Sequence, residues 1–253
     1  GIGDYAFYGC AGLTSVTIPN GITSIGSYTF EYCTGLKDVI IPNGVTSISP
    51  HIFSGCTKLN SVTLPNSITS IGWSAFEGCR GLTTIIIPNS VTSLDGWAFA
   101  GCTGLANITI PNNVNYLGKY AFLECSNLKK INIPNSIKHM EGCFFKCIKL
   151  GAVEITDIEA WCNIVFDAIY DDLSGHAITS NPLYYAHSLY LNGKPVKDLV
   201  IPDNVKSINN GAFYGCTGLK NITIPDSVTS IGSSAFGNTN PNLIINTSEN
   251  SAA

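Results

Sequence analysis

A repeat of 23 residues runs through most of this chain and constrains its fold more than any other feature. Phenylalanine, proline and cysteine each recur at this step in six copies. The phenylalanines are Phe7, Phe30, Phe53, Phe76, Phe99 and Phe122. A fixed period of this length is typical of a solenoid, in which similar units stack and share one core. The sequence therefore predicts an elongated array of about eleven turns, roughly 50 Å long at the usual spacing between strands.

The unit from Leu59 to Gly81 shows how each turn is predicted to fold. Apolar and polar residues alternate at its start, which is the period of a strand with one buried face. Pro65-Asn66 ends that strand, because proline cannot donate to a ladder and Pro-Asn favours a turn. A second short segment then returns along the other side. The residues predicted to point inward are Leu59, Val62, Leu64, Ile68, Ile71, Ala75, Phe76 and Cys79.

The strand pattern L-x-x-V-x-I, continued by P-N-x-V-T-S-I-G-x-x-A-F-x-x-C, resembles the BspA-like subclass of bacterial leucine-rich repeat surface proteins. The resemblance covers residues 1–156 and 196–245. It implies a mostly β solenoid, a right-handed leucine-rich repeat superhelix, in a single domain over residues 1–245. It also implies a secreted or cell-surface protein, since several members are implicated in adhesion to host matrix proteins or to other cells.

Residues 157–195 depart from the repeat. Apolar residues from Ile158 to Ile169 have helical spacing, and Asp157 is placed to cap a helix. Asn192-Gly193 lies between two apolar runs, which predicts a β-hairpin. The segment replaces two turns at nearly constant length, so we interpret it as modified turns within one solenoid. Residues 246–253 are rich in serine, asparagine and alanine and are predicted to form a flexible tail.

Composition makes several kinds of partner improbable. Only 12% of the residues are charged, the net charge is −4 and no cluster of Lys and Arg is present, so nucleic acid is not expected as a partner. No run of 18 apolar residues exists, and membrane insertion is not expected. The chain opens in mid-repeat, so we expect residues to precede Gly1, and the lack of a signal peptide does not indicate a cytoplasmic protein.

The ten cysteines mostly follow the repeat and allow two interpretations. They are buried thiols that fill gaps in the core, or some of them form disulfides between adjacent turns about 5 Å apart. A metal site is disfavoured because no C-x-x-C pair occurs and no histidine shares the column. The known catalytic and nucleotide-binding motifs are also missing from the sequence, so we expect no catalytic residue and no cofactor.

Acidic residues are concentrated in the irregular segment, where Asp167, Asp171 and Asp172 lie near His176. We interpret them as a solvated acidic face, because nothing in the sequence fixes them in a pocket. A cation site or an acid/base pair is the alternative.

The outward residues of the first strand of each turn, here called the strand face, are the first candidate binding surface. The curved sheet of a solenoid is its usual binding surface. The alternative is a solvated β-face made of good strand formers. The strand face consists of Ser15, Thr17, Asp38, Ile40, Ser61, Thr63, Thr84, Ile86, Asn107, Thr109, Lys130, Asn132 and Glu154.

A second set, the aromatic column, recurs just before the small residue that precedes each phenylalanine. Aromatic rings at the spacing of the turns could bind sugar rings or the apolar side chains of a partner. They could equally cover the phenylalanine core from outside. The aromatic column consists of Tyr5, Tyr28, His51, Trp97 and Tyr120.

These observations favour an extracellular or cell-surface module without enzymatic activity, monomeric, that recognises a protein partner such as a host matrix or cell-surface protein. It would use the strand face and the irregular segment. A carbohydrate-binding module that uses the aromatic column, with a glycan as its partner, is the first alternative. A passive structural spacer and an enzyme centred on residues 157–195 are the others.

Overall fold

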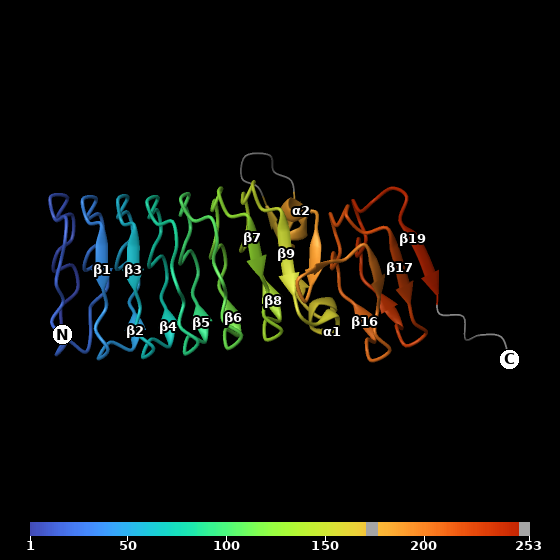
Figure 1. Cartoon of the computed structure of the whole chain (residues 1–253), viewed down its shortest axis with the longest axis horizontal. Helices are drawn as coiled ribbons and strands as arrows, with labels where there is room; N and C mark the ends of the chain where they lie inside the picture. The colour runs from blue at the N-terminus through green and yellow to red at the C-terminus, as the bar shows by residue number, and fades with distance from the viewer. Residues whose placement is uncertain (171–176, 248–253) are drawn as a thin grey trace.

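The computed structural model describes residues 1–170 and 177–247 and forms one elongated stack of short turns (Figure 1). The predicted β solenoid is confirmed, with about nine turns instead of about eleven. The count differs because the irregular segment uses more chain for each turn. Val153 pairs in register with Leu189, a much longer step than the 23 residues that separate Val39 from Val62.

The Leu-x-x-Val-x-Ile segments supply a first file of strands. The file consists of β1 (Asp38–Ile40), β3 (Ser61–Thr63), β7 (Lys130–Asn132), β9 (Ala152–Ile155), β13 (Leu189–Leu191), β15 (Asp198–Val200), β17 (Asn221–Ile224) and β19 (Ile244–Thr247). Parallel pairing joins β1 to β3, then β7 to β9 and β13, then β15 to β17 and β19. The predicted strands therefore form, but they fall into three separate sheets.

The second apolar segment of each turn supplies a second file of strands. This file consists of β2 (Ser47–Ile48), β4 (Ser70–Ile71), β5 (Ser93–Leu94), β6 (Tyr116–Leu117), β8 (His139–Met140), β10 (Val165–Phe166), β16 (Ser207–Ile208) and β18 (Ser230–Ile231). Pairing runs from β2 through β4 and β5 to β6, from β8 to β10, and from β16 to β18. Within the described residues no pairing joins β10 to β16, and this break shapes the surface discussed below.

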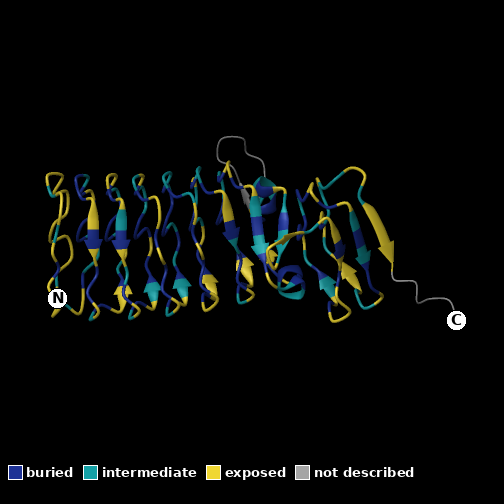
Figure 2. Ribbon diagram, in the orientation of Figure 1, coloured by how far each residue is buried: buried dark blue, intermediate teal, exposed yellow. Residues whose placement is uncertain are grey.

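The phenylalanines form the predicted ladder through the centre of the stack. Rings from Phe30 to Phe144 stack on their neighbours with centroids 5.2 to 5.7 Å apart, and each is essentially inaccessible to solvent. Figure 2 shows buried segments along the inner sides of the turns and exposed residues at the loops. All inward residues predicted for the unit from Leu59 to Gly81 are buried except Leu64, which is half-buried.

All ten cysteines are free thiols, and nine of them are buried. The buried-thiol interpretation is therefore correct and the disulfide alternative is not. Six of the thiols donate to a phenylalanine carbonyl of the preceding turn, as Cys79 Sγ does to Phe53 O at 3.1 Å. Burial raises the pKa of Cys56 to about 12 and raises that of Cys79 well above its ordinary value. The thiols are thus buried hydrogen-bond donors that link one turn to the next.

The irregular segment contains less helix than its spacing predicts. Helix α1 spans only Ile158–Cys162, with the carboxylate of Asp157 capping it by accepting from the N–H of Ala160 at 3.0 Å. The predicted continuation to Ile169 is wrong, because β10 pairs with β8 and β11 (Ala168–Tyr170) pairs antiparallel with β12 (Ala177–Thr179). A short isolated helix is marginal in water, so pairing with the open edge of β8 prevails over local spacing.

The predicted hairpin forms at Asn192-Gly193, both of which have positive φ, as a tight two-residue turn requires. Its second strand is β14 (Lys194–Pro195), antiparallel to β13, whereas β15 pairs onward with β17. Helix α2 (Leu183–Ala186) precedes it. At the other end, β19 runs through Thr247, two residues into the stretch predicted as a tail, and residues 248–253 lie outside the described part. Neither α1 nor α2 has the roughly 20 residues needed to cross a bilayer.

Asn181, which is buried, ties the irregular segment to the turn that follows it. Its amide nitrogen donates to the carbonyls of Gly211 and Ala212, both at 2.8 Å, and its oxygen accepts from the N–H of Leu183. The two carbonyls keep other donors, Tyr214 N–H for Gly211 and the indole N–H of Trp161 for Ala212. Removing the amide therefore leaves a cavity and the buried N–H of Leu183 without its partner, and such a group costs about 1–3 kcal/mol.

We therefore expect Asn181→Ala to lower the free energy of unfolding by about 2–3 kcal/mol in urea titrations. Asn60→Ala, at an exposed asparagine, is the control and is expected to change it by less than about 0.5 kcal/mol. Equal effects of the two substitutions would contradict the role assigned to Asn181.

Candidate recognition surfaces

The strand face points outward as predicted, since each of its thirteen residues is exposed or half-buried. Most carry hydroxyl or amide groups, but Ile40 and Ile86 are 68% and 83% exposed. At the end of the face Glu154 forms an ion pair with Lys130, whose ammonium group also lies over the ring of Tyr190. The face is thus a mild polar surface with two protruding aliphatic side chains.

The strand face is not one continuous sheet. In the described residues, the segment around Ile86 pairs with neither adjacent turn, and a groove of about 350 Å³ lies between it and the segment around Asn107. One turn further on, the amide of Asn132 donates to the carbonyl of Ile110 at 2.7 Å and accepts from its N–H at 2.8 Å. The amide of Asn132 therefore makes the two hydrogen bonds that a neighbouring strand would otherwise make, so the polar side chain at this position has a structural role.

The aromatic column occupies a backbone position that its sequence did not reveal. All five residues are left-handed, with φ between 55° and 60°. In this conformation the N–H of each residue donates to a carbonyl of the next turn, as Tyr28 does to Pro50 at 3.1 Å and Trp97 to Lys119 at 3.0 Å. The fold therefore fixes the left-handed backbone at this position in successive turns.

Other turns place smaller residues at this position. Glycine stands there as Gly142 and Gly211, both with φ of 63°, and serine stands there as Ser74 and Ser234. A non-glycine residue in the left-handed region costs on the order of 1–3 kcal/mol, and bulky side chains are uncommon in it. The aromatic column therefore places large rings where the backbone favours glycine.

The rings of the column recover part of this cost by contacting one another. Tyr5 and Tyr28 stack with centroids 4.6 Å apart, and so do Tyr28 and His51. Trp97 meets Tyr120 edge to face at 5.3 Å. Such pairs contribute about 0.5–1.5 kcal/mol each. Because stacked rings cover each other's faces, Tyr28 presents its edge to solvent, which disfavours stacking of a sugar ring on it.

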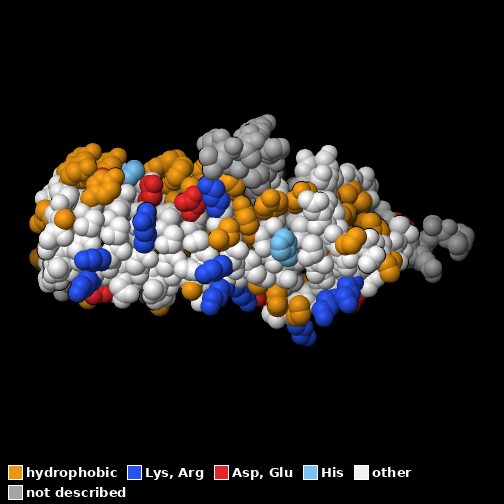
Figure 3. Space-filling view, turned by 90° about the horizontal axis from the view of Figure 1, so that it is seen from above, with side chains coloured by type: hydrophobic (Ala, Val, Ile, Leu, Met, Phe, Trp, Pro, Cys, Tyr) orange, Lys and Arg blue, Asp and Glu red, His pale blue; other side chains and the backbone are white. Residues whose placement is uncertain are grey.

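Carboxylates lie under the first part of the column. Glu31 is buried, with Oε1 3.7 Å from Nδ1 of His51. Burial raises the pKa of Glu31, and the nearby His51 opposes that rise. The charge of Glu31 is also the main cause that raises the pKa of Tyr32. Figure 3 shows hydrophobic side chains gathered over the N-terminal turns on this face. The surface is aromatic and has a negative local charge.

The acidic residues of the irregular segment form no site that the structure describes. Asp167 pairs with His139, with Oδ2 3.1 Å from Nδ1. Asp171, Asp172 and His176 lie outside the described residues. Among the residues that are described, no group of three or more His, Cys, Asp or Glu side chains is placed to hold a metal ion.

A family model described as "BspA type Leucine rich repeat region" matches in six copies over residues 1–94, 46–170 and 186–252. The chain belongs to the BspA-type leucine-rich repeat family. A search of curated proteins gave no match. The family assignment agrees with the resemblance of the repeat and accounts for both strand files.

Solved structures similar to this BspA-type chain are bacterial leucine-rich repeat proteins. The T. pallidum protein TpLRR is 29% identical, covering 56% of this chain and 71% of its own, with a TM-score of 0.53. A leucine-rich repeat protein from Bacteroides ovatus is 26% identical, covering 92% of this chain and 74% of its own, also with a TM-score of 0.53. A leucine-rich cell surface protein from Faecalibacterium prausnitzii is 26% identical, covering 98% and 76%, with a TM-score of 0.33.

Sequence reasoning placed the residues of both candidate surfaces on the outside of the turns, where they lie, but missed two features of the BspA-type solenoid. The sequence contained one sign of the left-handed backbone in the aromatic column, because glycine occupies the same place in the repeat at Gly142 and Gly211. Nothing in the sequence singled out the polar residues Asn209 and Asn210, which line the break in the second strand file. Their importance depends on the missing pairing between β10 and β16.

Proposed function

We propose that this BspA-type protein is a cell-surface recognition module that binds a protein partner through the aromatic column, with the strand face as a second contact surface. The observation that carries the proposal is the left-handed backbone of Tyr5, Tyr28, His51, Trp97 and Tyr120. Strained residues that the fold does not need are a reason to look for function. Glycine meets the same backbone requirement at Gly142 and Gly211, so the rings are not needed for the turn itself.

The chemistry of the column favours protein over glycan as the partner. The stacked rings offer edges and hydroxyl groups in a row instead of open faces. Glu31 beneath them attracts positive charge, and aromatic rings also bind Lys and Arg side chains. A protein surface with basic and aliphatic side chains fits both properties. The cell-surface location follows from the BspA-type family and is part of the same proposal, as is the absence of catalysis.

Replacing Tyr28 by glycine tests this function, because it removes a ring and relieves the left-handed strain. Purified wild-type protein is first screened against a panel of extracellular-matrix and cell-surface proteins by surface plasmon resonance. We expect Tyr28→Gly to weaken binding of the partner at least tenfold, in line with an aromatic contact worth about 2 kcal/mol. We expect the free energy of unfolding to change by less than about 1 kcal/mol, because strain relief offsets lost stacking.

Tyr116→Ala is the matched control, since Tyr116 is an exposed tyrosine of β6 in the second strand file. It is expected to bind the partner like the wild type. Unchanged binding by Tyr28→Gly would exclude the aromatic column as the contact surface. Failure of every protein in the panel to bind would favour the passive spacer.

A further inference from the structure

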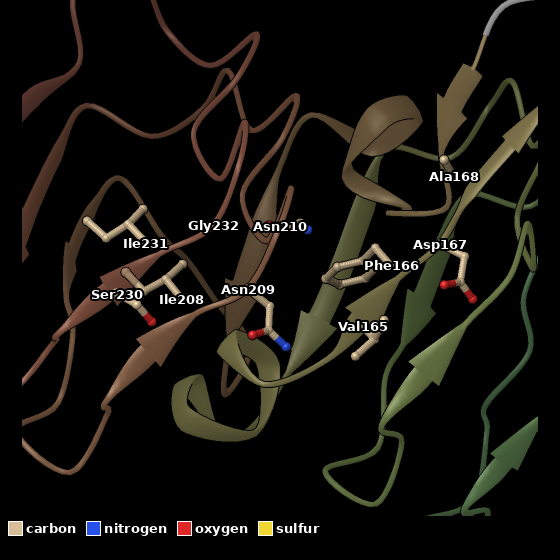
Figure 4. Close-up of a pocket in the computed structure, with 10 residues that line it drawn as sticks. All are labelled: Val165, Phe166, Asp167, Ala168, Ile208, Asn209, Asn210, Ser230, Ile231 and Gly232. Atoms are coloured by element: carbon tan, nitrogen blue, oxygen red, sulfur yellow. The ribbon is translucent and has the colours of Figure 1, made fainter.

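A cleft of about 590 Å³ opens in the second strand file between β10 and β16 (Figure 4). Most adjacent strands of this file pair directly, as β4 does with β5, and in the described residues the other neighbours without a pairing are β6 and β8. At the break, the N–H of Asn209 donates to the carbonyl of Cys162 in α1 at 2.9 Å, and its amide nitrogen reaches the carbonyl of Ile164 at 3.3 Å. Helix α1 thus takes up bonds that a paired strand would make, and the space beside it stays open.

Five of the ten residues that line the cleft are apolar, and three carry amide or hydroxyl groups. Asn209 and Asn210 line it directly after β16, Ser230 lines it from β18, and Phe166 extends toward them from β10 (Figure 4). A second hollow of about 220 Å³ shares Phe166 and Asn210 and adds Tyr214. The two hollows therefore form one groove, with Phe166 where they meet and Tyr214 in the second hollow.

Two consecutive asparagines present fixed and opposite hydrogen-bonding groups to this groove. The oxygen of Asn210 accepts from the N–H of Ser233 at 2.8 Å, which directs its amide nitrogen, a donor, away from that bond. Asn209 uses its nitrogen on Ile164, which leaves its oxygen as an acceptor. A free donor on one asparagine and a free acceptor on the other suit a ligand with several hydroxyl groups, because a hydroxyl both donates and accepts.

The lining excludes other classes of ligand. None of the described residues around the two hollows is Lys or Arg, so an anion has no countercharge. Asp167 is the one carboxylate among them, and it is paired with His139, which leaves no ligand set for a metal ion. The free donor of Asn210 and the free acceptor of Asn209 disfavour a wholly apolar ligand, which would leave them unpaired.

We propose that this groove binds a short neutral saccharide, with its apolar faces against exposed apolar side chains of the lining, such as Val165 and Ile231, and its hydroxyl groups on Asn209 and Asn210. The volume lies within the range of about 300–1,000 Å³ that small-molecule sites occupy. Phe166 is only 8% exposed and is backed by Trp161, with ring centroids 5.3 Å apart, so the floor is rigid. This site is separate from the aromatic column, and glycan binding here does not depend on the protein partner.

The substitution Asn210→Asp tests the site without removing its structural bond. An aspartate can accept from the same N–H, as Asp4 does from the N–H of Ser27 at 2.7 Å in the first turn. It replaces the donor amide by an oxygen that cannot donate. Binding of glucose, galactose, N-acetylglucosamine, cellobiose and maltose is measured by saturation-transfer NMR and calorimetry on the full chain. We expect at least one of these sugars to bind the wild type and its affinity to fall five- to tenfold in Asn210→Asp.

Ala168→Leu provides a second variant, since Ala168 lines both hollows and is exposed, and the larger side chain fills the groove. It is expected to abolish the NMR signal, while Ile86→Ala on the strand face leaves it unchanged. Circular dichroism and the urea midpoint of each variant show whether it is folded. Lack of binding by the wild type to all five sugars at 10 mM would overturn the proposal, and so would equal affinity of the wild type and both groove variants.

Discussion

Raising the pH from 8 to 10 is expected to destabilise this protein by on the order of 10 kcal/mol, enough to unfold it. Nine thiols are buried, and burial raises the pKa of the innermost ones, such as Cys102 and Cys125, well above the ordinary value. An unfolded thiol ionises at about pH 8.5. The stability that buried neutral thiols contribute is complete below that pH. It is lost as the pH rises toward their folded pKa values, which are about 12 for Cys143 and Cys147.

Each thiol that stays neutral in the fold lowers the free energy of unfolding by about 1.4 kcal/mol per pH unit above the unfolded pKa. Urea titrations between pH 7 and 10.5 measure the slope. Replacing Cys79, Cys102 and Cys125 by alanine is expected to reduce it by about 4 kcal/mol per pH unit, while tyrosines and lysines contribute equally to both proteins. A stability that stays constant up to pH 10 would show that the thiols are not buried in the folded protein.

Phe76→Ala is expected to lower the free energy of unfolding by about 3–5 kcal/mol. The ring of Phe76 is fully buried and stacks on Phe53 at 5.5 Å and on Phe99 at 5.2 Å. Its removal leaves a cavity in the middle of the ladder that the fixed spacing of the turns cannot close. Because each turn contacts only its neighbours, the two halves of the stack are expected to lose cooperativity, which broadens the urea transition.

Phe7→Ala is the control for this effect. Phe7 holds the same position in the first described turn, stacks only on Phe30 at 5.3 Å and is 36% exposed. We expect a loss of about 1–2 kcal/mol with no broadening. Equal losses at the two positions would contradict the assignment of Phe76 to a closed core.

The irregular segment shows where sequence reasoning was sound and where it failed. Asp157 caps α1 and Asn192-Gly193 turns the hairpin, because both depend on bonds made within a few residues. The helical spacing from Ile164 to Ile169 was misleading, because β10 instead pairs with β8, which is far away in sequence. Long-range pairing of this kind leaves no local pattern in one strand.

The sequence by itself determined the solenoid, its BspA-type repeat, the phenylalanine ladder and the inward position of the thiols. One spacing repeated at every turn puts the same side chain at the same depth, so a single register specifies the whole core. Only the tertiary structure decided the left-handed backbone of Tyr28 and its neighbours in the aromatic column, and the cleft beside Asn210. The left-handed backbone and the cleft both depend on which carbonyl or strand edge of the next turn a given N–H contacts. This contact is a property of two stacked turns, and the sequence of one turn does not specify it.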